Sequence, residues 1–176
     1  MTGTQRARPQ VPAAVVEELK AIVGPSGYLE SAADVAAYCR SWRDDWQGAT
    51  PLVVRPQSTE EMARVVALCA RSGVAIVPQG GNTGLTGAGQ PNADKSEIVV
   101  STSRMRKILA VDTVNDTMTV EAGVILKEIQ SAADAADRLF PLSLGAEGSC
   151  QIGGNISTNA GGVQVLRYGN TRALVL

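Results

Sequence analysis

The stretch PQGGNTGLTGAG, residues 78–89, contains five glycines and no charged residue. It follows the apolar run VAIV and lacks both the lysine of a triphosphate-binding loop and the glycine order of a dinucleotide fingerprint. Glycine permits positive φ angles and a close approach of backbone N–H groups to an anion, and Asn82 and Thr83 add side-chain donors. The stretch therefore indicates a loop that holds a pyrophosphate, with a turn-rich surface loop as the alternative.

A second stretch, GSCQIGGNISTNAGG at residues 148–162, has the same character. It combines glycines with hydroxyl and amide side chains, and none of residues 148–162 is charged. Two uncharged, glycine-rich loops exceed what a fold needs for turning. Together they predict two walls of one elongated ligand site in which the backbone makes most contacts.

The segments around both stretches indicate a mixed α and β protein. Strand 51–56, helix 58–73 and strand 74–78 form a predicted βαβ unit with parallel strands. Further elements expected from apolar periodicity and turn residues are helices at 13–24 and 31–39, a strand at 97–102, a hairpin of 108–112 with 117–123, a helix at 124–138 and the start of a strand at 173–176. We expect a tail with short helices over 1–45, an α/β part over 46–105 and an α+β part over 106–176.

The composition excludes several classes of function. Sixteen Lys and Arg balance 17 Asp and Glu, which gives no electrostatic footprint for nucleic acid. The absence of histidine excludes histidine catalysis, histidine metal ligation and a histidyl-linked cofactor within this sequence. Three dispersed cysteines favour buried free thiols over disulfides or zinc. No apolar run is long enough to span a membrane, so we expect a cytoplasmic protein, with peripheral membrane association left open.

Both glycine-rich stretches resemble the FAD-binding domain of flavin-linked D-2-hydroxyacid dehydrogenases, within the vanillyl-alcohol oxidase/p-cresol methylhydroxylase group. The strings that carry the resemblance are PQGGNTGL and GSCQIGGNISTNAGG, and it covers residues 45–176. It implies an α+β fold of two subdomains with non-covalently bound FAD, the second subdomain being truncated at the end of the chain. The cofactor-binding residues that it implies are Pro78, Gly80, Gly81, Asn82, Thr83, Gly84 and Leu85, with Gly145, Ala146, Ser149, Cys150, Gly154, Asn155, Thr158, Asn159 and Ala160.

The resemblance further implies oxidation of a D-2-hydroxy acid, of the D-lactate, D-2-hydroxyglutarate or glycolate class, to a 2-oxo acid. Electrons would pass to a quinone, a cytochrome or an electron-transfer flavoprotein. The family's metal ligands, catalytic base and carboxylate-binding arginines have no counterpart in these 176 residues, so we expect no catalytic or metal-binding residue and an inactive fragment of a longer enzyme. The alternatives are a non-catalytic binding module, which would tolerate valine at Gly80 and Gly81, and an FAD-dependent reductase of the same fold.

Other candidate residues have plainer interpretations. Asp44 and Asp45 are neighbours in sequence, which rarely gives a shared catalytic geometry, so we expect a solvated or capping role. Arg167 and Tyr168 match the family's RYGN string and favour a structural role. Glu147 would repel a phosphate, and we expect it to bond the backbone or face solvent.

Overall fold

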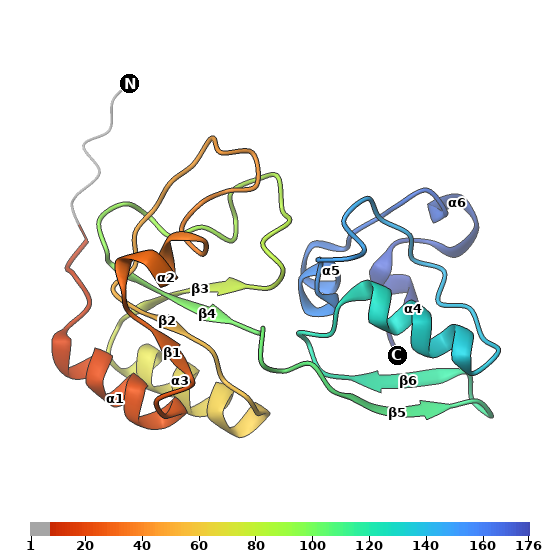
Figure 1. The fold of residues 1–176 in the computed structure, drawn as a ribbon, viewed down its shortest axis with the longest axis horizontal. Helices are drawn as coiled ribbons and strands as arrows, with labels where there is room; N and C mark the ends of the chain where they lie inside the picture. The colour runs from red at the N-terminus through yellow and green to blue at the C-terminus, as the bar shows by residue number, and fades with distance from the viewer. Residues whose placement is uncertain (1–7) are drawn as a thin grey trace. The chain divides into compact units, whose positions relative to one another are not determined.

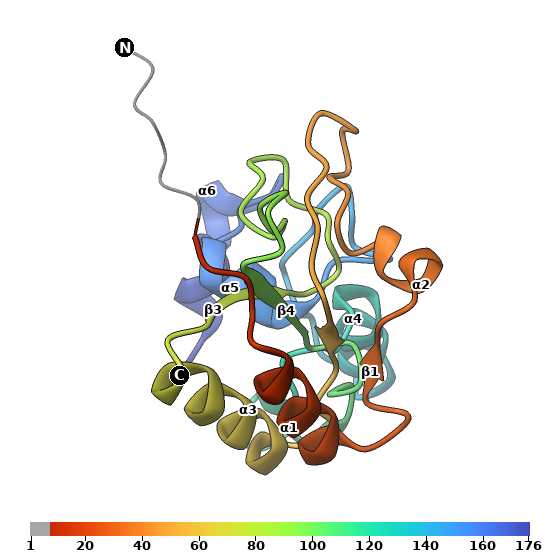
Figure 2. The same cartoon turned by 90° about the vertical axis from the view of Figure 1, so that its left-hand side faces the viewer.

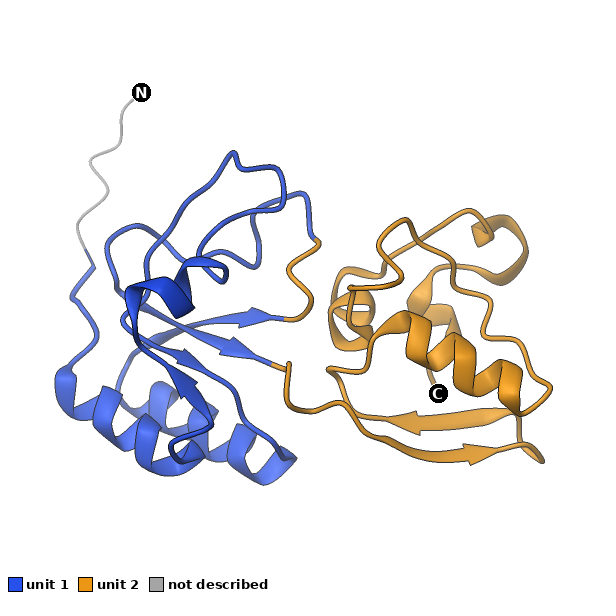
Figure 3. Cartoon of the chain, in the orientation of Figure 1, with its two compact units in different colours: residues 1–79, 84–101 blue, residues 80–83, 102–176 orange. Residues whose placement is uncertain are grey.

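The computed structural model describes residues 8–176 and divides the chain into two compact units (Figure 3). Unit 1 comprises the chain up to Gln79 together with Gly84–Ser101, and unit 2 comprises Gly80–Thr83 with Thr102–Leu176. The main division falls between residues 101 and 102, not at the expected 105. Thr102 and Met105 belong with unit 2 because Gly123 N–H donates to the Met105 carbonyl over 2.8 Å.

Unit 1 is built on a four-stranded sheet in the order β1-β2-β4-β3 (Figure 1). Its strands are β1 (Tyr28–Leu29), β2 (Val53–Val54), β3 (Ala75–Gln79) and β4 (Glu97–Ser101). The predicted strands of the βαβ unit, β2 and β3, are parallel, but each pairs with β4, which lies between them. Every residue of β4 is buried, so this strand takes the central place.

Helices cover both faces of the unit 1 sheet (Figures 1 and 2). Helices α1 (Ala13–Val23) and α3 (Thr59–Arg71) pack on the face that carries Val54, Ile98 and Val100, and α2 (Ala32–Ala36) lies on the opposite side. The range 1–45, expected to hold a tail and short helices, contains α1 and α2. Three apolar residues of α1 spaced one turn apart are buried in the unit 1 core: Val15, Leu19 and Val23. Residues 1–7 lie outside the described part.

Helix α3 begins where its sequence predicts. The Ser58 hydroxyl accepts a hydrogen bond from the Glu61 N–H over 3.2 Å, which satisfies one of the free donors of the first turn. Replacing Ser58 with alanine is expected to lower the free energy of unfolding by about 1 kcal/mol. Urea unfolding followed by circular dichroism measures this loss. Ser58→Asp, which keeps the acceptor, should stay near the parent, and equal stability of both variants would contradict the cap.

Unit 2 contains a β-hairpin covered by a helix. Strand β5 (Ile108–Asp112) pairs antiparallel with β6 (Thr117–Val120), and α4 (Leu126–Ala135) follows, so the predicted hairpin and helix are confirmed. The core joins Val124 and Ile129 to the hairpin side chains and to Ile152. Alternating and helical apolar spacing therefore predicted the correct faces here.

The chain after residue 150 differs from the expected loop. It forms α5 (Ile152–Thr158), α6 (Val165–Tyr168) and a 3-10 turn at Thr171–Leu174, where the start of a strand was expected. Two glycines in α5 disfavour a helix, but Ile152 and Ile156 lie one turn apart and pack into the unit 2 core. The 3-10 turn is fixed by buried Thr171, whose hydroxyl donates to the Ala160 carbonyl over 2.6 Å.

Candidate functional site

The two glycine-rich stretches meet inside unit 2. A Cβ atom built on Gly81 would lie 1.9 Å from the Ser149 carbonyl oxygen, and one built on Gly80 would lie 3.4 Å from the Gln151 side chain. Residues 80–83 therefore run directly against residues 149–151. The structure brings these segments together, as the sequence suggested, and glycine at 81 is required by the packing of the chain itself.

The structure shows which residues of the first stretch use left-handed backbone. Within residues 78–89, left-handed φ angles occur at Gly87, with φ 77°, and at Asn82, with φ 53°. Gly80, Gly81 and Gly84 do not adopt positive φ, so their conformation alone does not require glycine. Because a side chain at Gly81 would collide with the Ser149 backbone, valine there would disturb the fold whether or not a ligand binds. Such a variant cannot separate a binding module from a cofactor site.

Four other glycines face open space. Among residues 8–176, no heavy atom comes within 4 Å of a Cβ built on Gly84, Gly145, Gly148 or Gly154, beyond the local backbone. Their φ angles also lie outside the left-handed region. Neither packing nor conformation requires glycine there, and Gly154 in α5 weakens its helix by up to about 1 kcal/mol relative to alanine. These positions leave bare backbone that a ligand can approach closely.

The implied cofactor-binding residues are divided between the units. Pro78, Gly84 and Leu85 belong to unit 1, with the Leu85 side chain 58% exposed. The remaining members belong to unit 2: Gly80–Thr83, Gly145, Ala146, Ser149, Cys150, Gly154, Asn155, Thr158, Asn159 and Ala160. Several of these last residues serve the fold. Thr158 donates its hydroxyl to the Gly154 carbonyl over 2.9 Å, and Asn159 ends α5 in the left-handed conformation with φ 51°.

Cys150 packs in the core. Its side chain lies with Leu126 and Leu142, and its thiol accepts the amide of buried Asn155 over 3.4 Å. Its backbone N–H donates to Ala146, and its carbonyl accepts from Leu126. Both backbone groups and the thiol are thus used within the chain. Cys150 and Asn155 therefore contribute to packing, their contact with a cofactor stays a prediction, and Gly148 and Gln151, which the implied list omits, are added as candidates.

All three cysteines are free and buried, as the dispersed spacing indicated. Burial raises the pKa of the Cys39 and Cys69 thiols, which disfavours the reactive thiolate. In the folded protein, all three thiols are expected to react with a disulfide reagent at least tenfold more slowly than in urea. Absorbance of the released chromophore measures the rates. A fast-reacting thiol in the native protein would contradict the packing described for these residues.

Gln79 anchors the far end of the first glycine stretch in unit 1. This residue is 3% exposed, and its Nε2 donates to the Gly89 carbonyl over 2.6 Å and to the Tyr38 carbonyl over 2.8 Å. One buried amide thus ties the loop's end to β3 and to the segment after α2. Glycine spacing gave no sign of this anchor.

The acidic residues considered as candidates, Asp44, Asp45 and Glu147, form hydrogen bonds or ion pairs with other side chains of the chain. The Asp44 carboxylate pairs with Arg40, which lowers the pKa of that carboxyl, and Asp45 accepts from the Ser41 hydroxyl over 2.8 Å. Glu147, expected to bond the backbone or face solvent, is partly exposed, and its carboxylate accepts from the Gln130 amide over 3.1 Å. Among the described residues, no cluster of three or more acidic or cysteine side chains could hold a metal ion.

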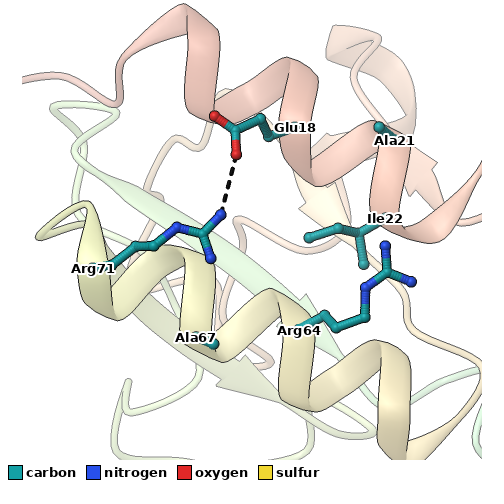
Figure 4. A pocket seen from close by; sticks show the side chains of 6 residues that line it. All are labelled: Glu18, Ala21, Ile22, Arg64, Ala67 and Arg71. Atoms are coloured by element: carbon teal, nitrogen blue, oxygen red, sulfur yellow. Dashed lines mark hydrogen bonds and ion pairs between the residues drawn. The ribbon is translucent and has the colours of Figure 1, made fainter.

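A surface groove of about 370 Å³ lies between α1 and α3 in unit 1 (Figure 4). Its polar lining is an exposed ion pair of 3.2 Å between Glu18 and Arg71, with Arg64 beside Ile22. None of the implied cofactor-binding residues lines it. The groove is a feature of helix packing and is separate from the glycine-rich segments.

A family model described as an FAD-binding domain matches residues 50–176, which is more than half of the chain. The chain belongs to the FAD-binding domain family. The FAD-binding domain is similar to a probable mitochondrial D-2-hydroxyglutarate dehydrogenase of Oryza sativa, with 41% identity over 92% of the chain and 28% of the relative. It is also similar to a putative mitochondrial D-lactate dehydrogenase of Schizosaccharomyces pombe, with 36% identity over 92% of the chain and 32% of the relative.

A solved structure of alkyldihydroxyacetonephosphate synthase superposes with a TM-score of 0.83 at 25% identity, over 96% of this chain and 32% of that one. The likeness confirms the predicted fold class, and the family confirms FAD as the cofactor. The domain spans about a third of the length of these relatives. Both curated relatives are named as mitochondrial, so the cytoplasmic location stays a prediction. Within residues 8–176, no helix has the length and apolar character needed to cross a membrane.

The residues present fit FAD. Its diphosphate and ring carbonyls are hydrogen-bond acceptors, and the Ser149 hydroxyl and the Gln151 amide are donors; the nearby Glu147 carboxylate is bonded to Gln130 and paired with Lys127. The uncrowded glycines Gly145, Gly148 and Gly154 provide bare backbone of the kind that a large, flat ligand needs for close contact.

Proposed function

We propose that this domain holds FAD in an enzyme that oxidises a D-2-hydroxy acid to a 2-oxo acid. The observation that carries the proposal is the group of glycines in unit 2 that neither packing nor conformation explains. The names of the curated relatives support D-2-hydroxyglutarate or D-lactate as the substrate, with glycolate in the same chemical class. Bound FAD would supply the hydride acceptor, and the residues of this chain would bind and orient it.

We propose that residues 80–83, together with Gly145, Gly148, Ser149 and Gly154, supply most of the contacts from unit 2. Gly145, Gly148 and Gly154 present backbone without side-chain obstruction, and the exposed Ser149 supplies a hydroxyl. Gly84 has uncrowded backbone and Leu85 an exposed apolar side chain, and both are further proposed contacts. The other proposed contacts are Pro78, Asn82, Thr83, Ala146, Cys150, Asn155, Thr158, Asn159 and Ala160.

Replacing Gly154 with alanine is expected to change stability and cofactor affinity in opposite directions. Without FAD, the variant should melt at the parental temperature or higher, because alanine favours a helix by up to about 1 kcal/mol over glycine. Its affinity for FAD should fall about tenfold, or about 1.4 kcal/mol, because the new methyl group occupies the ligand's space. Flavin fluorescence titration and thermal melting of the ligand-free protein measure the two effects.

The matched control is Ser131→Ala, an exposed change to alanine in α4 of the same unit. It should leave FAD affinity unchanged. Parental affinity in Gly154→Ala would show that this backbone does not face the cofactor, and failure of the parent chain to bind FAD would contradict the proposed function.

The substrate class is tested in cells that lack the gene. Loss of the enzyme should cause its substrate to accumulate, and chiral chromatography of the 2-hydroxy acids identifies it. We expect the D-isomer of a chiral substrate to rise severalfold while its L-isomer stays constant, or the achiral glycolate itself to rise. Accumulation of neither D-2-hydroxyglutarate, D-lactate nor glycolate would contradict the substrate class without affecting the FAD-binding result.

A further inference from the structure

Gln151 occupies an unusual position beside the first glycine-rich segment. Its side chain is only 8% exposed, and its Cβ and Oε1 atoms both lie 3.4 Å from a Cβ built on Gly80. The residue immediately precedes α5, yet its side chain makes no capping hydrogen bond with that helix. The Gln151 amide therefore does not serve as the N-terminal cap of α5.

Only one half of the Gln151 amide is bonded within the described part of the chain. The Thr102 hydroxyl donates to Oε1 over 2.6 Å, which fixes the orientation of the planar amide. No hydrogen bond from Nε2 to any of residues 8–176 is present, although that nitrogen keeps access to solvent. Because an amide NH₂ carries two donors and this one is accessible without a partner among residues 8–176, the group is available to a ligand.

We propose that the Gln151 amide donates a hydrogen bond to an acceptor oxygen of bound FAD. The proposal rests on the proposed function, and it adds Gln151, which lies within the second glycine-rich string but is not among the cofactor-binding residues that the resemblance implies. Phosphate and ring carbonyl oxygens are both suitable acceptors for a neutral amide. Thr102 is a positioning residue. Its hydroxyl holds Oε1 of the planar Gln151 amide, and this fixes the direction in which the NH₂ group points.

Gln151→Glu tests the proposal with little change in shape. A carboxylate keeps an acceptor for the Thr102 hydroxyl but replaces both amide donors with a negatively charged oxygen. FAD affinity should fall by about 10- to 100-fold, more than in Gln151→Leu, which removes the donors without adding charge. The melting temperature of the ligand-free protein is recorded in parallel. Gln10→Glu, the same chemical change at an exposed site in unit 1, should bind FAD as the parent does.

The positioning role of Thr102 is tested by removing its hydroxyl group. Thr102→Val keeps the shape of the side chain but frees the Gln151 amide to rotate, and we expect about fivefold weaker FAD binding. Thr102→Ser retains the donor and should restore parental affinity. A purely structural role for Thr102 would change the melting temperature of the ligand-free protein and leave the affinity unchanged.

Two simpler probes identify the acceptor. If Gln151→Glu weakens ADP binding, the amide serves the diphosphate part of FAD, and if it weakens riboflavin binding, the amide serves the ring; either result supports the proposal. Parental FAD affinity in both Gln151 variants would overturn it while leaving the proposed function intact. A parent chain that binds no FAD would overturn both.

Discussion

Gly81→Ala is expected to unfold unit 2. The new methyl carbon would lie 1.9 Å from the Ser149 carbonyl oxygen and 3.0 Å from the Cys150 Cα. These are backbone atoms, and the Cys150 carbonyl also accepts the Leu126 N–H at the start of α4, so relief requires moving several elements together. We expect a loss of about 3 kcal/mol or more in the free energy of unfolding, the upper range for overpacking. Amide hydrogen exchange in α4 and α5 measures the loss of protection directly.

Gly145→Ala is the matched control for this prediction. It makes the same chemical change in the same unit, at a position where no other heavy atom lies within 4 Å. Its unfolding free energy should stay within about 0.5 kcal/mol of the parent. If Gly81→Ala were as stable as Gly145→Ala, residues 80–83 would not pack against residues 149–151 as described.

Ile98→Ala is expected to destabilise unit 1 by about 2–5 kcal/mol. Ile98 is fully buried in β4, which hydrogen-bonds to strands on both sides, and its side chain packs where α1 and α3 meet the sheet. Removing three carbons there leaves a cavity that two paired strands cannot collapse to fill. Denaturant unfolding followed by hydrogen exchange in β3 and β4 measures the effect.

The control for this change is Ile98→Val, which removes one carbon and should cost about 0.5–1.5 kcal/mol. A second control, Val66→Ala, removes apolar carbons from a 44% exposed position on α3 and should cost less than Ile98→Ala. Equal losses in Ile98→Ala and Val66→Ala would contradict the central place of β4.

The elements that could be predicted from sequence are those whose signal is local. Helix α3 has a capping serine, an apolar stripe and a closing glycine within sixteen residues, and the β5–β6 hairpin shows alternation across a tight turn. Helix α5 could not be found this way. Its two glycines oppose a helix, and it forms because Ile152 and Ile156 pack against residues far away in the sequence.

In the candidate site too, local features could be predicted from the sequence and long-range contacts could not. The glycine strings marked the two segments, because a bare, uncharged backbone is a property of the residues themselves, and their resemblance to a known family implied FAD. They could not show what each glycine does. Gly81 is needed where two backbones approach, while Gly154 has open space around it, and that difference depends on the three-dimensional neighbours.

By itself, the sequence determined the mixed α and β character, the parallel strands, the hairpin and the position of the two glycine-rich segments, since periodicity, caps and glycine composition act over a few residues. Only the tertiary structure decided that Gly80–Thr83 joins unit 2, that Cys150 belongs to the core and that Gln151 keeps free donors. These outcomes depend on contacts between residues tens of positions apart. Such contacts determine which backbone is covered by the chain itself and which remains bare for a ligand.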